Sequence, residues 1–122
     1  MDHSHTITSL AQTVFDSIGF GFSERIYHNA LEVIFRTHQI PYESERIVPV
    51  TFLNHVIGNI RADLIVFHTS DSPIVVELKA VNCINSSMIN QSLSYLKMTQ
   101  IQKALLINFS PQGLQVEHIH LT

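Results

Sequence analysis

The stretch IRADLIVFHTSDSPIVVELKA, residues 60–80, contains two apolar, β-branched runs separated by a short polar segment. Runs of this composition, joined by Thr, Ser and Asp, predict two strands of an antiparallel hairpin. Each run also carries charge that an ordinary buried strand lacks, namely Asp63 in the first run and Glu77 with Lys79 in the second. Because strand side chains alternate between faces, Glu77 and Lys79 point to the same side of the sheet.

The register of this hairpin decides whether the three charged side chains meet. If the turn is centred near Ser70, Asp63 pairs opposite Glu77, and any even register keeps the three charges on one face. A slip of one residue would move Asp63 to the opposite face. The centred register is therefore an assumption on which the predicted site depends.

The spacing of apolar residues predicts eight elements in all, including the two strands of this hairpin. Helices are expected at Ile7–Ile18 and from an N-cap at Ser23 to about His38. Pro49 indicates a sheet edge or a bulge. In chain order, the other expected elements are strands at Tyr42–Phe52, Val56–Phe67 and Ile74–Val81, a helix at about Ser87–Met98, and strands at Ala104–Phe109 and Leu114–Leu121.

This order, ααβββαββ, predicts an α/β fold with a mixed β-sheet flanked by helices. The third strand, the helix after it and the strand from Ala104 suit a right-handed crossover between parallel strands.

The composition favours one folded domain over residues 1–122, because 45% of the residues are hydrophobic and only 14% are charged. The formal net charge of −3 lacks the basic excess of most nucleic-acid binders, so contact with phosphate would need a local arrangement or a metal. No run approaches the roughly 18 apolar residues of a membrane span, and the N-terminal segment lacks the regions of a signal peptide. With Cys83 as the single cysteine, we expect an intracellular protein, cytoplasmic or nuclear, that does not bind membranes.

Asp63, followed by Glu77-x-Lys79 on the next strand and then by a helix, resembles the PD-(D/E)XK nuclease superfamily. The core of that superfamily has the order helix, three strands, helix, strand, so the resemblance implies a restriction-endonuclease-like core. The likeness spans about residues 7–109, and Ala62 stands where the superfamily name has proline.

Two further motifs support the resemblance. The segment GFSERIY, residues 21–27, is similar to the signature of the GxxExxY branch of the superfamily. The segment QSLSY, residues 91–95, resembles the QxxxY motif of RecB-type members.

The resemblance implies a nuclease that uses Mg²⁺, with Mn²⁺ as a substitute, to hydrolyse phosphodiester bonds of nucleic acid, in particular DNA. Asp63, Glu77 and the Leu78 carbonyl would be metal ligands, and Glu24 would bind through water or hold a second ion. Two neighbouring carboxylates favour the charged form of Lys79. We therefore expect Lys79 to orient water and stabilise the transition state.

Other residues are candidates for substrate contact or support. Gln91 and Tyr95 would bind the nucleic-acid backbone or steady Lys79, and Tyr27 and Arg61 complete the candidate set. A chain this small would gain binding surface as a symmetric homodimer.

Each of these residues also has a plain structural interpretation. Glu77 and Lys79 could form the solvent face of a strand, and Glu24 could serve only the helix dipole. Tyr27 fits a core position, while Gln91, Arg61 and Arg25 fit an exposed surface. Surface positions are also expected for the eight histidines, because neither the pair His118 and His120 nor the pair His3 and His5 has a third ligand at a metal spacing. A non-catalytic module that binds nucleic acid or protein, and a small-molecule binding domain, are the alternative functions.

Overall fold

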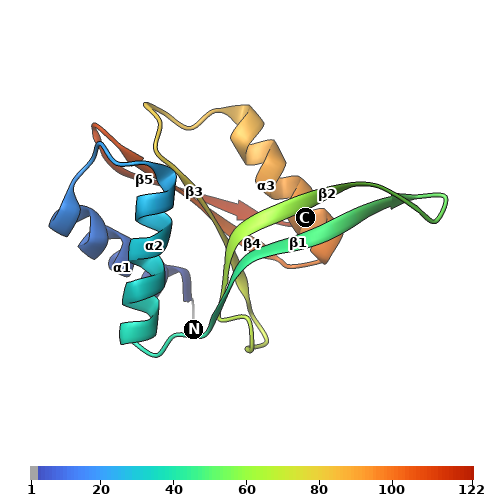
Figure 1. Cartoon of the computed structure of the whole chain (residues 1–122), viewed down its shortest axis with the longest axis horizontal. Helices are drawn as coiled ribbons and strands as arrows, with labels where there is room; N and C mark the ends of the chain where they lie inside the picture. Colours follow the sequence, from blue (N-terminus) through green and yellow to red (C-terminus); the bar gives the residue numbers. More distant parts are fainter. Residues whose placement is uncertain (1–2) are drawn as a thin grey trace.

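The computed structural model describes residues 3–122 (Figure 1). Met1 and Asp2, which belong to the N-terminal segment considered above, lie outside the described residues. The elements are α1 (His3–Ile18), α2 (Glu24–Thr37), β1 (Tyr42–Phe52), β2 (His55–Val66), β3 (Ile74–Lys79), α3 (Ser86–Thr99), β4 (Lys103–Ser110) and β5 (Gly113–His120). The predicted order and the α/β class are confirmed. None of the helices in this described part is long and apolar enough to cross a membrane.

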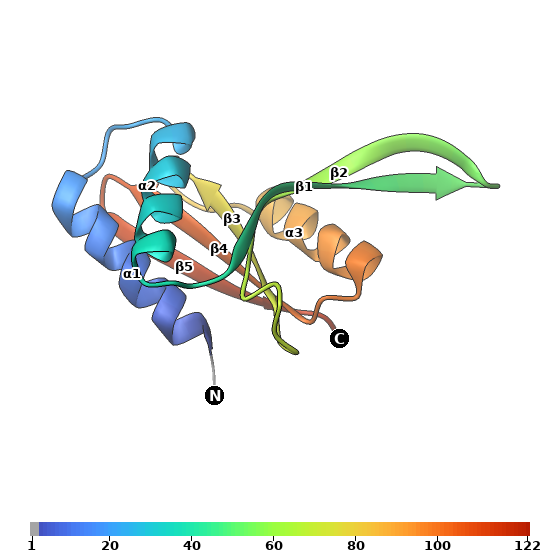
Figure 2. The ribbon, with the colours of Figure 1, turned by 60° about the horizontal axis from the view of Figure 1, so that its bottom comes forward.

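The strands form one mixed sheet in the order β1-β2-β3-β4-β5. β3 and β4 are parallel and are connected through α3, whereas the other neighbouring strands are antiparallel. The predicted parallel crossover is thus confirmed. α1 and α2 cover one face of the sheet and α3 covers the other (Figures 1 and 2).

The alternation of side chains along β3 assigns its residues to two hydrophobic clusters. Ile74, Val76 and Leu78 pack with α1 and α2, while Val75 packs with α3. Glu77 and Lys79 continue the series of Val75, so they lie on the α3 face of the sheet. The core under α1 and α2 therefore holds the strand in place, while the charged residues face the other helix.

Two element boundaries differ by more than one residue from those expected. α1 begins at His3 instead of Ile7, because its polar first turn is anchored to the sheet: Ser4 is buried and its hydroxyl accepts a hydrogen bond from Lys103 Nζ at 3.0 Å. β3 ends at Lys79 instead of Val81, because the buried side chain of Asn108 binds both the N–H and the C=O of Val81, each at 2.9 Å.

β1 and β2 extend far beyond the rest of the sheet. They pair from Tyr42–Val66 to Phe52–His55, but β2 pairs with β3 only over Leu64–Val66. The outer part of the hairpin, residues 47–60, projects from the body as a two-stranded ribbon, here called the arm (Figures 1 and 2). The predicted features of Pro49 are both present, since β1 is the edge strand and its register shifts at Val50–Thr51.

Asn108 should be important for stability because its buried amide satisfies three part-buried groups: the two of Val81 and Gln115 Oε1 at 2.9 Å. We predict that Asn108→Ala lowers the free energy of unfolding by about 2–3 kcal/mol, since it leaves three part-buried polar groups without this partner. Urea denaturation followed by circular dichroism measures this loss. Asn90→Ala, at an exposed position of α3, is the control and should change stability by less than about 0.5 kcal/mol.

Candidate active site

Asp63 lies where β2 turns away from β3. The last backbone pairs between the two strands are Leu64–Val76, Ile65–Val75 and Val66–Ile74, so the next residues along the same register are Asp63 and Glu77. At this point the Asp63 carboxylate accepts a hydrogen bond from the Leu78 N–H, at 2.8 Å from N to Oδ2. The register centred on Ser70 is therefore confirmed.

The separation of the two strands leaves a pocket of about 320 Å³ on the α3 side of the sheet. It brings together most of the residues singled out from the sequence. The lining consists of Glu24, Asn59, Ile60, Arg61, Asp63, Glu77, Lys79, Gln91 and Tyr95. A second hollow of about 210 Å³ adjoins it and shares Glu24, Arg61 and Asp63.

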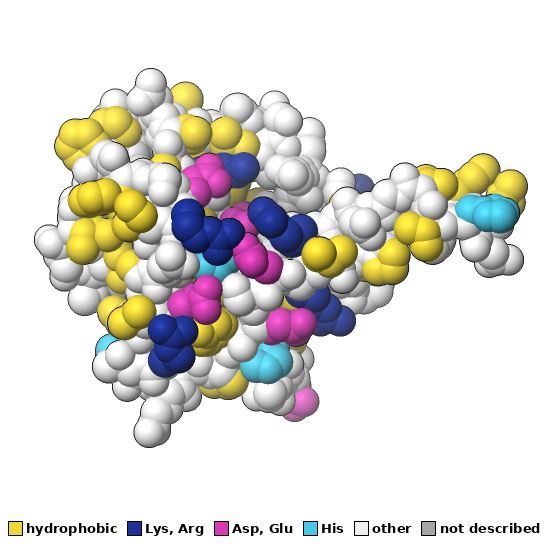
Figure 3. Space-filling model, viewed as in Figure 1, with side chains coloured by type: hydrophobic (Ala, Val, Ile, Leu, Met, Phe, Trp, Pro, Cys, Tyr) yellow, Lys and Arg dark blue, Asp and Glu magenta, His cyan; other side chains and the backbone are white. Residues whose placement is uncertain are grey.

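Acidic side chains gather between basic ones on the face of the molecule between α2 and the arm (Figure 3). A larger hollow of about 380 Å³ is lined by other residues, among them His3, Asp71 and His120. Since it contains none of the residues predicted to act, chemistry and not size identifies the candidate site.

Glu77 has the most perturbed carboxyl group of this pocket. Burial raises its pKa to about 9, and the charge and hydrogen bond of Asp63 act in the same direction, against the smaller opposing effect of Lys79. Two adjacent carboxylates in a partly buried pocket cannot both be ionised at neutral pH without a compensating cation. The pocket therefore favours either a proton or a positive ion at Glu77.

Tyr95 reaches the pocket from α3 with a buried hydroxyl group. The residue is 2% exposed, and no group among residues 3–122 makes a hydrogen bond with its hydroxyl oxygen. Burial raises the pKa of this phenol. Gln91 lies one turn earlier on the same face of α3 but is exposed at the rim. The Asn85 side chain caps the helix by accepting the Met88 N–H at 3.0 Å, which fixes where α3 begins.

Glu24 is the first residue of α2 and is exposed. It lines the pocket, but it does not join Asp63 and Glu77 in a close group, since no three His, Cys, Asp or Glu side chains of residues 3–122 are placed to hold a metal together. The neighbouring carboxylates of Asp63 and Glu77 supply oxygen donors of the kind that Mg²⁺ prefers. Their donor chemistry fits a divalent ion.

Tyr27, a candidate for substrate contact or support, does not line the pocket and occupies the core position that its sequence also fitted. The residue is fully buried and stacks on Phe109, with ring centroids 4.1 Å apart. Its hydroxyl donates to the Gly19 carbonyl at 2.7 Å and accepts the Phe22 N–H at 3.4 Å. Tyr27 thus fixes the turn that leads into α2, and with it the position of Glu24.

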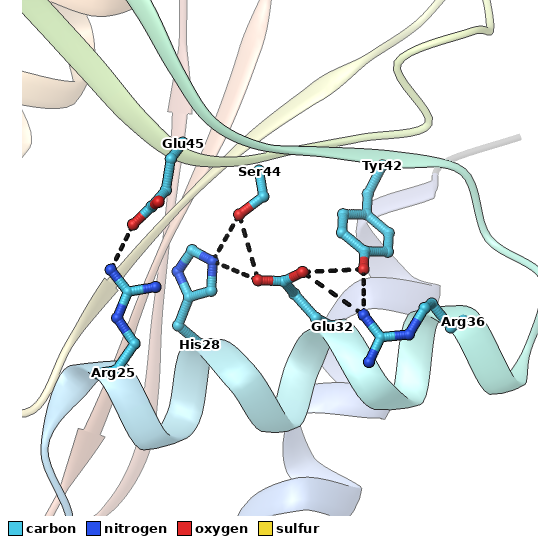
Figure 4. A network of polar contacts seen from close by, with 7 residues as sticks. All are labelled: Arg25, His28, Glu32, Arg36, Tyr42, Ser44 and Glu45. Atoms are coloured by element: carbon cyan, nitrogen blue, oxygen red, sulfur yellow. Dashed lines mark hydrogen bonds and ion pairs between the residues drawn. The ribbon is translucent and has the colours of Figure 1, made fainter.

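A polar network between α2 and β1 was not predicted from the sequence (Figure 4). His28 is 4% exposed, and its Nε2 lies 2.9 Å from both Ser44 Oγ and Glu32 Oε2. Tyr42 donates to Glu32 Oε1 at 3.0 Å, and Arg36 donates to the Tyr42 hydroxyl at 2.6 Å.

The expectation that the histidines are surface residues is therefore wrong for His28, which also lines the second hollow beside Asp63. The signal was its position one residue after Tyr27 and three before Leu31, on the buried side of the helix. Near the start of α2, Arg25 forms an ion pair with Glu45 of β1. These contacts hold the helix against β1 and fix the direction from which Glu24 approaches.

Comparison with known proteins agrees with this geometry. The model of the PD-(D/E)XK nuclease superfamily matches residues 1–120. A solved structure described as "Crystal structure of SSO0001" is similar with a TM-score of 0.61 and 22% sequence identity, over 80% of this chain and 50% of that one. This chain thus spans about half the length of that neighbour, and the likeness at this identity concerns the fold. No curated protein matches the chain. The match over nearly the whole sequence shows that the chain belongs to the PD-(D/E)XK nuclease superfamily.

Proposed function

We propose that the chain is a divalent-metal-dependent nuclease that hydrolyses phosphodiester bonds, with DNA as the expected substrate. The observation that carries the proposal is the meeting of Asp63, Glu77 and Lys79 in one pocket where the pKa of Glu77 is raised to about 9. Strongly perturbed carboxyl groups in a cleft are typical of catalytic and metal sites. Assignment to the GxxExxY branch stays a prediction.

Asp63, Glu77 and the Leu78 carbonyl are the proposed ligands of Mg²⁺ or Mn²⁺. When bound, such an ion supplies a Lewis acid for the phosphate and lowers the pKa of its water. Asp63 is already oriented, because its Oδ2 accepts the Leu78 N–H. Glu24, across the pocket, is proposed to act through water or at a second ion, because it stands apart from the other two carboxylates.

Lys79 is proposed to stabilise the negative charge that develops on the phosphate. It lies two residues after Glu77 on the same face of β3 and lines the pocket. A fixed positive charge in a partly buried pocket acts more strongly than one in water.

The two adjoining hollows provide a path for a polynucleotide backbone. Arg61 lines both, Arg25 lines the second and Asn59 lines the first, so basic and amide donors flank the carboxylates in a chain whose net charge is −3. Gln91 and Tyr95 stand on the α3 side of the first hollow. Phosphate contacts of this kind position the chain but do not read its sequence.

Removal of the central charges tests the proposal. We predict that Asp63→Asn and Lys79→Ala each lower the rate of Mg²⁺- or Mn²⁺-dependent cleavage by at least about 100-fold, since each removes a group that acts on the reacting phosphate. Cleavage of labelled single- and double-stranded DNA and of RNA is measured on gels.

Asp16→Asn and Lys97→Ala, at exposed positions outside the pocket, are the matched controls and should cut like the wild type. Equal inactivity of the wild type and all variants on every substrate and with both metals would instead favour a non-catalytic binding module.

The buried hydroxyl of Tyr95 gives a second test, because a group without a partner costs stability unless a ligand uses it. We predict that Tyr95→Phe raises the free energy of unfolding of the ligand-free protein by about 1 kcal/mol and lowers cleavage about tenfold. Thermal melts and the cleavage assay measure the two effects. A loss of stability together with unchanged cleavage would show that the hydroxyl serves only the fold.

The raised pKa of Glu77 predicts how stability depends on pH without metal. Between the ordinary carboxyl pKa and the folded value of about 9, the unfolded chain has lost this proton while the folded protein still holds it. Stability should therefore fall as pH rises through this range. Glu77→Gln should remove most of this slope and stabilise the metal-free protein at pH 7.5 by about 1–3 kcal/mol.

Urea denaturation in chelator at several pH values measures this effect, with the exposed Glu117→Gln as the control. Added Mg²⁺ or Mn²⁺ should raise the melting temperature of the wild type but not of Glu77→Gln. A wild-type stability that rises with pH across this range would contradict the assignment.

A further inference from the structure

The arm, residues 47–60, exposes an unusual amount of apolar surface. Five large hydrophobic side chains on it are each more than 60% exposed: Ile47, Phe52, Leu53, Val56 and Ile57. The base of the arm is covered, because Val48 and Ile60 pack against the hydrophobic cluster under α3. The exposed outer part is a two-stranded hairpin, which is marginally stable in water without a third strand or a covering helix. Exposed apolar patches of this kind mark surfaces that contact a partner.

Leu53, at the tip of the arm, has an unusual backbone conformation and an unusually high exposure for a leucine. It is 76% exposed and has a φ of 48°, followed by Asn54 with a φ of 65°. A two-residue turn with positive φ at both positions favours Asn, Asp or Gly, because larger side chains are strained there. Neither solvent nor turn geometry accounts for a leucine at this position, whereas contact of the tip with an apolar partner does.

The charge of the arm indicates what kind of partner covers it. From Ile47 to Ile60 there is no Asp, Glu, Lys or Arg. A nucleic-acid backbone would require basic side chains along the contact, and the arm has none. Depletion of charge with enrichment of large apolar side chains is instead the composition of a protein interface core.

We propose that the arm is the dimerisation element of this protein and that it packs face to face against the arm of a second copy of the chain. A two-fold interface brings the same surface of each copy together. Because the arm is uncharged, two arms can meet without like-charge repulsion, although the chain has a net charge of −3. The five side chains do not all lie on one face, because Phe52 is an odd number of positions from Ile47 on β1, so face-to-face packing leaves Phe52 outside the contact. Val56 pairs with Thr51 on the Ile47 face, and the register shift places Ile57 on that face as well. Covering Ile47, Leu53, Val56 and Ile57 on both copies would bury on the order of 1,000 Å², near the lower bound for a specific interface. Pro49 lacks an N–H group on the edge strand, which disfavours pairing through that edge and leaves the faces for contact.

Sedimentation velocity of the full chain tests the proposal independently of catalysis. The wild type should dimerise with a dissociation constant of about 1–10 µM. Leu53→Asn should weaken the dimer at least tenfold, while the melting temperature of the monomer stays equal or rises, because Asn suits the turn. Ile57→Thr keeps a β-branched residue and should weaken the dimer to a similar extent.

Two controls separate this inference from loss of folding and from the proposed activity. Val33→Ala changes an exposed apolar residue of α2 and should leave the dimer intact. Lys79→Ala, which addresses cleavage, should also dimerise like the wild type. A wild type that stays monomeric at about 100 µM would overturn the proposal. If Leu53→Asn also weakened the binding of DNA, the arm would be assigned to nucleic acid. Equal dimerisation of the wild type and both arm variants would overturn it as well.

Discussion

The hydrogen bond from the Leu78 N–H to the Asp63 carboxylate is the constraint on which the rest of the site depends. In an unbroken ladder a backbone carbonyl of β2 would accept this N–H. Because a side chain accepts it instead, β2 can leave β3 without leaving a buried donor unsatisfied. The same separation opens the pocket and releases β2 into the arm, so the site and the arm have a common structural origin.

The sequence predicts the parts of this arrangement that depend on local pattern. The polar turn around Ser70 sets the register of Asp63 against Glu77, and alternation along β3 places Lys79 on the same face. The arm was not predicted, because the alternating apolar pattern of β1 and β2 is the same whether a strand is covered or projects into solvent. His28 was missed for a related reason: its burial depends on Ser44 and Glu32, which only the tertiary structure brings to it.

β3 tolerates charge because its two faces have different roles. Val76 and Leu78 are buried in the core under α1 and α2, and the parallel pairing with β4 continues to Lys79. This anchoring holds Glu77 in a position where burial and the nearby Asp63 raise its pKa to about 9. An isolated strand would not keep the carboxyl group in such an unfavourable position. Packing of one face of β3 in the core thus offsets the unfavourable burial of a carboxyl group on the other face, as is common at functional sites.

The two sides of the pocket differ in burial, and the carboxylates do not form one close cluster. Asp63 and Glu77 belong to the sheet and are partly buried, whereas Glu24 and Gln91 are exposed on helices at the rim. The backbone of α2 is nevertheless fixed, because Tyr27 holds the turn before it and Glu32 joins it to β1. Only the side chain of Glu24 is then left free to adjust, so the site combines two preorganised carboxylates with a third whose position a bound ion and substrate can complete.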